Sequence, residues 1–118
     1  MTPAARIAAV IELLSDGPQN VPAGQVLRRG LQKRRYAGSG DRAAISALFW
    51  IVHRTLARLG WHLQQHGYAP TPRALVLAAL ALVDQLPAGD IVALFGGDSK
   101  HAAEALDEQE IALITAFE

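Results

Sequence analysis

The residues best placed to do chemistry in this sequence are basic ones, gathered on both sides of a glycine-rich corner. Six of the eleven Lys and Arg lie close together: Arg28, Arg29, Lys33, Arg34, Arg35 and Arg42. Tyr36 follows the tract, and Gly38-Ser39-Gly40 then predicts a turn into the N-terminus of a long helix. Arginine side chains and the free N–H groups at a helix N-terminus both bind phosphate oxygens. The tract and corner therefore predict a nucleic-acid site, with contacts from the six basic residues and Ser39.

Two tryptophans suggest a second way of holding nucleic acid. Trp50 and Trp61 lie near Arg54 and Arg58 by helical spacing, and an arginine beside an indole can stack on a base. Large aromatic side chains are usually highly buried, however, which favours a core position for Trp50. The basic tract also has an alternative interpretation, because runs of charge are often solvated surface.

Residues for catalysis or metal binding are few. The chain has no cysteine, which excludes disulfides, zinc–thiolate sites and thiol nucleophiles within it. The Gly-Ser-Gly corner lacks the lysine and the spacing of a phosphate-binding P-loop. His62 and His66 are spaced for a metal, but no carboxylate is near them in sequence, and two surface histidines are the favoured interpretation. We therefore expect no catalytic residue, no metal and no cofactor in this chain.

Length and charge indicate one domain, spanning 1–118, with its charges unevenly distributed. Residues 1–83 hold ten Lys and Arg against three Asp and Glu, a net +7, whereas residues 84–118 hold one against eight, a net −7. Such asymmetry favours a basic face for an anionic partner. The most apolar run, 74–83, is shorter than the roughly 20 residues of a membrane span, and no secretory signal is evident. We expect a cytoplasmic protein without a membrane partner.

Hydrophobic spacing and capping residues predict an all-α fold. No segment alternates with the period of two that a half-buried strand requires. The predicted helices span 3–15, 22–34, 41–59, 61–66, 72–86 (ended by Pro87) and 88–95, with a last one after a capping box of Asp107 and Glu110. Helix 41–59, capped by Ser39 or Gly40 and ended or bent at Gly60, is apolar over much of its circumference. The fold class is thus a bundle of about six to seven helices around a central helix 41–59.

A known family resembles this chain over nearly its whole length. The N-terminal region of bacterial Sun-type RNA (cytosine-5) methyltransferases looks like the segments MTPAARIAAVIELL, VLRRGLQKRRYAGSGDRAAISALFWIVHRTLARLGW, TPRALVLAALAL, ALFGG and DEQE. The most specific match runs from Arg35 to Arg42 and resembles the family's tyrosine/phenylalanine-alanine-glycine-serine-x-aspartate-arginine signature. That region of the family is similar to the antitermination factor NusB, an all-helical RNA-binding fold. The resemblance implies a NusB-like domain here.

The resemblance also implies a role: the domain positions rRNA for a catalytic domain that lies elsewhere in a longer protein. In the family, that catalytic domain binds S-adenosylmethionine and attacks cytosine with a cysteine thiolate. We expect this chain to be the N-terminal fragment of such a methyltransferase, because its last apolar pattern reaches Glu118 without a helix cap. The expected partners are rRNA and the downstream catalytic domain.

Alternatives remain open at the level of sequence. Asp41 and Arg42 have a structural interpretation, in which they cap and tie helices instead of touching RNA. The alternative function for the whole chain is a protein-interaction module that docks through its acidic C-terminal part or an apolar patch. A free-standing NusB-like transcription antitermination factor is a further possibility, and a small independent enzyme is the least supported.

Overall fold

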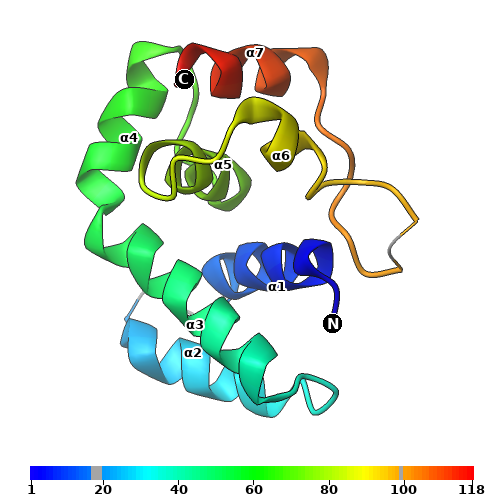
Figure 1. Ribbon diagram of the computed structural model, residues 1–118. Helices are drawn as coiled ribbons and strands as arrows, with labels where there is room; N and C mark the ends of the chain where they lie inside the picture. The colour runs from blue at the N-terminus through cyan, green and yellow to red at the C-terminus, as the bar shows by residue number, and fades with distance from the viewer. Residues whose placement is uncertain (17–19, 99) are drawn as a thin grey trace.

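The computed structural model describes residues 1–16, 20–98 and 100–118, and over these residues it contains helices and no strands (Figure 1). The helices are α1 Pro3–Ser15, α2 Ala23–Gln32, α3 Ser39–Arg54, α4 Leu56–Gln65, α5 Pro72–Leu82, α6 Ala88–Val92 and α7 Glu108–Ala116. The predicted all-α fold class is confirmed.

Three of the helices begin where capping chemistry predicts. The Thr2 hydroxyl accepts a hydrogen bond from the Ala5 N–H at 3.0 Å, and the Thr71 hydroxyl accepts one from the Ala74 N–H at 3.2 Å. In both cases a proline follows at the first helical position, where its missing N–H is not needed. Asp107 and Glu110 form the predicted reciprocal capping box of α7. Each cap stabilises its helix by about 1 kcal/mol.

Helix α5 occupies the centre of the bundle. All seven residues from Ala74 to Leu80 are buried, and the helix packs against α1, α3, α4, α6 and α7 (Figure 1). Its alanines let neighbouring helices approach on several sides, while Val76 and Leu77 fill the space between them. The deep burial predicted for this segment is confirmed, but the prediction that helix 41–59 is central is wrong.

The predicted helix 41–59 is in fact two helices that meet at Thr55. The Thr55 hydroxyl donates to the Ile51 carbonyl at 2.7 Å, and the backbone of Thr55 leaves helical geometry at φ −113° and ψ 18°. Such back-bonding by threonine bends helices. Gly60, expected to end or bend the helix, lies inside α4 instead. The chain therefore turns five residues earlier than its glycine indicates.

Other helix ends also differ from the predicted ones. Helix α5 ends at Leu82, where the chain turns so that the Leu86 N–H donates to the Leu80 carbonyl at 3.0 Å. Gln85 takes a left-handed φ of 56° within this turn, and Pro87 caps α6 instead of ending α5. Helix α6 is short, and among the described residues of 100–106 none is helical.

Candidate nucleic-acid interface

Helix α2 lies on the outside of the bundle, along the lower edge in Figure 1. Only Leu27 and Gly30 of this helix are buried, and both face the core on the same side. At 3.6 residues per turn, the opposite side presents Arg28, Gln32, Arg29 and Lys33, all of which are exposed. The amphipathic pattern thus positions three of the predicted basic residues toward solvent.

Four cationic side chains form the surface that we call the basic face: Arg28, Arg29, Lys33 and Arg35. All four are exposed. None of them makes an ion pair with a carboxylate of the residues that the structure describes. Two arginines elsewhere, Arg6 and Arg73, are held by carboxylates at 2.7 Å. Arg54 and Arg58, by contrast, are exposed and also lack an ion pair with the described residues. The basic face therefore carries charge that no ion pair of the described residues neutralises, although Asp16 lines the same hollow as Arg29 and Lys33.

Arg34 points inward, unlike its neighbours in the sequence. The residue is only 8% exposed, its Nη2 donates to Glu12 at 2.6 Å, and its Nη1 donates to the Gly30 carbonyl at 2.8 Å. This ion pair joins the end of α2 to α1. Helical spacing predicts this orientation. Arg34 follows Gly30 by four residues and Leu27 by seven, so it lies on the same side of the helix as these two buried residues. The guanidinium of Arg34 is committed to the fold, so we exclude it from the basic face.

Arg42 holds the corner between α2 and α3 together. Its Nε donates to the Ala37 carbonyl at 3.1 Å and its Nη2 donates to the Arg34 carbonyl at 3.2 Å. The same segment is closed by a turn in which the Ala37 N–H donates to the Arg34 carbonyl at 3.0 Å. The Arg42 side chain thus satisfies two carbonyl groups that flank Arg35 and Tyr36. This geometry favours the structural interpretation of Arg42.

The N-terminus of α3 is occupied by a carboxylate from the chain itself. Gly38 is the N-cap, whereas the sequence predicted Ser39 or Gly40, and Ser39 is instead the first helical residue. Asp41 accepts from Arg6 Nε at 2.7 Å, from the Gly38 N–H at 3.0 Å and from the N-terminal ammonium at 3.4 Å. The Arg6 hydrogen bond, followed by that of Gly38, lowers the pKa of Asp41 despite opposing desolvation. A phosphate at this helix end would meet that negative charge, so the basic face is the better anion site.

Both tryptophans are surface residues. Trp50 is 37% exposed and packs edge-on against Phe49 with 5.4 Å between ring centroids, so the favoured core position is wrong. Trp61 is 58% exposed on α4. The predicted pairing of these indoles with Arg54 and Arg58 is not observed, since the described part of the chain has one cation–π contact, between Arg73 and Phe95.

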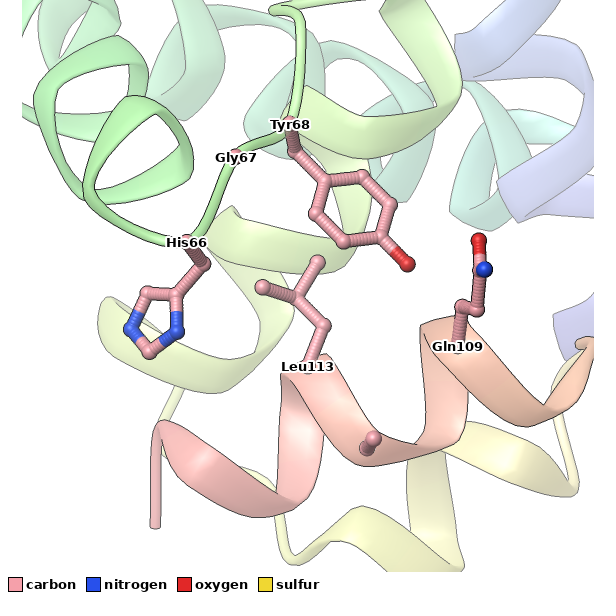
Figure 2. A pocket seen from close by; sticks show the side chains of 6 residues that line it. His66, Gly67, Tyr68, Gln109 and Leu113 are labelled. Carbon is pink, nitrogen blue, oxygen red and sulfur yellow. The ribbon is translucent and has the colours of Figure 1, made fainter.

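A groove of about 420 Å³ lies between the end of α4 and α7, as Figure 2 shows. It is lined by His66, Gly67, Tyr68, Gln109, Ala112 and Leu113. The Tyr68 hydroxyl is buried without a hydrogen-bond partner among the described residues, and burial raises its pKa, with smaller effects from the Asp107 and Glu110 carboxylates. The His66 imidazole lies edge-on to the Phe117 ring, with 5.1 Å between the ring centroids. The groove therefore contains a polar atom, the Tyr68 hydroxyl oxygen, that has no partner among the described residues.

His62 and His66 both lie beside Phe117. Both imidazoles lie edge-on to the Phe117 ring, at 6.2 and 5.1 Å between centroids. Across the described residues, no three side chains of the histidine and carboxylate types gather closely enough to hold a metal ion.

Comparisons of the chain with protein-family models, with curated proteins and with solved structures gave no match. By its fold alone, the chain is an all-α helical bundle whose outer helix, α2, is basic. Within the described ranges, no helix combines the length and apolarity needed to traverse a bilayer.

Proposed function

We propose that this chain is an RNA-binding domain that holds the phosphate backbone on its basic face. One observation carries the proposal: Arg28, Arg29, Lys33 and Arg35 are exposed on α2 and on the turn that follows it, without a carboxylate ion pair in the described structure. Cations on this edge are suited to a polyanion, because each one that neutralises a phosphate releases a condensed counterion from the nucleic acid.

Folding accounts for only part of this charge. A cation in the last turn of a helix is favoured by the helix dipole, and Arg29 lies in that turn of α2. Against this, Arg29 and Lys33 are four residues apart, and like charges at that spacing destabilise a helix by about 0.2–0.5 kcal/mol. Arg35 lies beyond the helix altogether. Binding of an anionic ligand explains the whole cluster more simply than stabilisation of α2 does.

The acidic C-terminal helix is far from this surface, although one carboxylate of the N-terminal half, Asp16, lines a hollow together with Arg29 and Lys33. Most of the carboxylates of 84–118 lie on or near α6 and α7, and α7 is at the opposite edge of the molecule from α2 (Figure 1). The charge asymmetry along the sequence therefore becomes an asymmetry in space. A polyanion approaching α2 meets positive potential without a nearby acidic helix, which accelerates association and makes it salt-dependent.

The resemblance supports a more specific form of the proposal. In that form the chain positions rRNA for an S-adenosylmethionine-dependent (cytosine-5) methyltransferase domain in the same parent protein. The family signature from Arg35 to Arg42 forms the corner that follows the basic helix, next to the proposed phosphate site. The cofactor and the cysteine nucleophile would belong to the other domain.

Salt dependence of RNA binding tests the proposal. The logarithm of the association constant for single-stranded RNA should fall linearly with the logarithm of salt concentration, by about 0.7 for each phosphate neutralised. Changing Arg28, Arg29 and Lys33 together to glutamine should flatten the slope by about 2 units, if each contacts one phosphate. Fluorescence anisotropy with labelled RNA at several salt concentrations measures this slope.

Two control variants separate phosphate contact from other effects. Arg58→Gln removes an exposed arginine from α4, outside the basic face, and should leave the slope unchanged. Arg34→Gln breaks the ion pair with Glu12 and should lower the melting temperature, with a slope like that of the wild type. An unchanged slope in the triple variant would refute the role of the basic face.

A second candidate function, a protein-docking module, is favoured by the exposed apolar surface of α4. Trp61 is 58% exposed and Leu56 is 45% exposed, and Trp61 borders a groove of about 580 Å³ that runs to Pro70. A tryptophan at the mouth of a groove is typical of an interface anchor. The occupant would be the catalytic domain of the parent protein. Light scattering of the two parts should then show a complex that Trp61→Glu abolishes.

A further inference from the structure

Tyr36 and His101 form a pair of stacked rings on the surface. Their ring centroids are 6.0 Å apart and their planes differ by 22°. They come from opposite halves of the sequence: Tyr36 from the corner before α3, and His101 from the segment between α6 and α7. Tyr36 is nevertheless 62% exposed, so most of its ring surface is free. The contact with His101 covers little of this aromatic side chain.

The backbone that presents Tyr36 is firmly held. Ala37, the next residue, is 5% exposed and anchors the corner in the interior. Arg42 binds the carbonyl groups of Arg34 and Ala37, on either side of Tyr36. An exposed ring on a fixed turn loses little backbone freedom when a ligand stacks on it, which favours binding. Arg42 is thus a positioning residue for Tyr36.

Charges flank the two rings. Arg35 precedes Tyr36 and belongs to the basic face, and Lys100 precedes His101; both are exposed. Neither forms an ion pair with the described residues. Aromatic rings beside cations are the combination that proteins use to bind unpaired nucleotides, with bases on the rings and phosphates on the charges. The centroids of the Tyr36 and His101 rings are 6.0 Å apart, which is toward the long end of the range of about 4.5–7 Å for aromatic pairs.

We propose that Tyr36 and His101 form a stacking platform for an unpaired nucleobase of the RNA whose phosphates lie on the basic face. This inference rests on the proposed function and makes it more specific. Bases inside a duplex are stacked on each other and cannot reach a ring on the protein surface. The ligand therefore contains at least one splayed-out base, in a loop, a bulge or a single strand.

The experiment compares two RNAs, a 12-nucleotide single strand and a perfect duplex of the same sequence, by anisotropy at fixed salt. Tyr36→Leu should weaken binding of the single strand by about 5- to 150-fold, the range for losing one base–aromatic stack. It should leave duplex binding and the salt slope unchanged, because no phosphate contact is removed. Tyr36→Phe should bind the single strand as the wild type does, because the ring and not the hydroxyl stacks on the base. His101→Ala should weaken binding of the single strand less than Tyr36→Leu does.

Trp61→Leu is the matched control, since it removes an equally exposed aromatic ring from α4. It should not change either affinity, and thermal melting of each variant checks that the fold is kept. The stacking platform is overturned, while the basic face stands, if Tyr36→Leu binds the single strand as the wild type does with a normal salt slope. The stacking platform is also overturned if Tyr36→Leu loses equal affinity for the single strand and for the duplex. If the wild type binds neither RNA in a salt-dependent way, both proposals fall.

Discussion

Replacing Gly30 by alanine should destabilise this protein, although alanine is the better helix former. Gly30 lies in α2 where the helix crosses Leu13 of α1, and a Cβ atom at position 30 would be 1.9 Å from Leu13 Cδ2 and 3.3 Å from its Cγ. Carbon atoms in favourable contact are about 3.5–4.0 Å apart. Either the Leu13 side chain or the whole of α2 must therefore move.

The magnitude follows from two opposing effects. Leu13 is 1% exposed, so a new rotamer must either displace packed neighbours or enter the hollow of about 180 Å³ that Leu13 and Gly30 line, and overpacking of this kind costs about 1–3 kcal/mol. Replacing a helical glycine by alanine recovers about 1 kcal/mol. A shift of α2 would also stretch the hydrogen bonds from Arg34 to Glu12 and to the Gly30 carbonyl. We expect a net loss of up to about 2 kcal/mol in the free energy of unfolding.

Gly60 provides the matched control. It also lies inside a helix, α4, but a Cβ atom there would have no other atom within 4 Å, and its φ is not positive. Gly60→Ala should therefore stabilise the protein by about 0.5–1 kcal/mol. With a urea dependence of about 1–3 kcal/mol per molar, the unfolding midpoints of the two variants should differ by about 1 M. Equal stabilisation by both substitutions, measured by far-UV circular dichroism, would refute the close contact between α2 and Leu13.

Two further predictions concern carboxylates. Glu110 accepts a hydrogen bond from Arg73 Nε at 2.7 Å and also caps α7. Glu110→Gln should therefore lower the free energy of unfolding, measured in urea, by about 1–3 kcal/mol. Glu108→Gln, on the exposed side of α7, should have little effect. Hydrogen bonds from Arg6 and Arg73 lower the pKa values of Asp41 and Glu110, respectively. Their contribution to stability is complete above the ordinary carboxyl pKa near 4 and is lost as pH falls through the lowered values, so melting temperatures should drop steeply below about pH 4. Asp41→Asn should make that acid-side drop shallower, and a wild-type melting temperature that stays constant from pH 6 to pH 2 would contradict the two ion pairs.

The parts of the fold that depend on local chemistry could be predicted from the sequence. Thr2-Pro3, Thr71-Pro72 and the Asp107–Glu110 capping box each marked a helix start, because the cap residue bonds to a backbone group only three positions away. The long apolar run of α5 similarly predicted burial. These features need no knowledge of the rest of the chain.

Features that depend on partners far away in the sequence were missed. The break at Thr55 was assigned to Gly60, because glycine is the more obvious helix breaker and the course of the chain around α5 is not visible from sequence. The inward turn of Arg34 toward Glu12 depends on how α2 crosses α1. The stacking of Tyr36 on His101 joins residues that no local pattern connects.

The signature from Arg35 to Arg42 combines two kinds of residue, and the distinction decides what a resemblance to it can mean. Asp41 ties α3 to Arg6 and the N-terminus, and Arg42 clamps the turn at Ala37, so both serve the corner itself. A protein that has these two residues at the same positions is expected to form the same corner, whatever ligand it binds. Tyr36 and Arg35, by contrast, are exposed and contribute little to that scaffold. The function therefore has to be tested on Tyr36 and the basic face, while Asp41 and Arg42 report on folding.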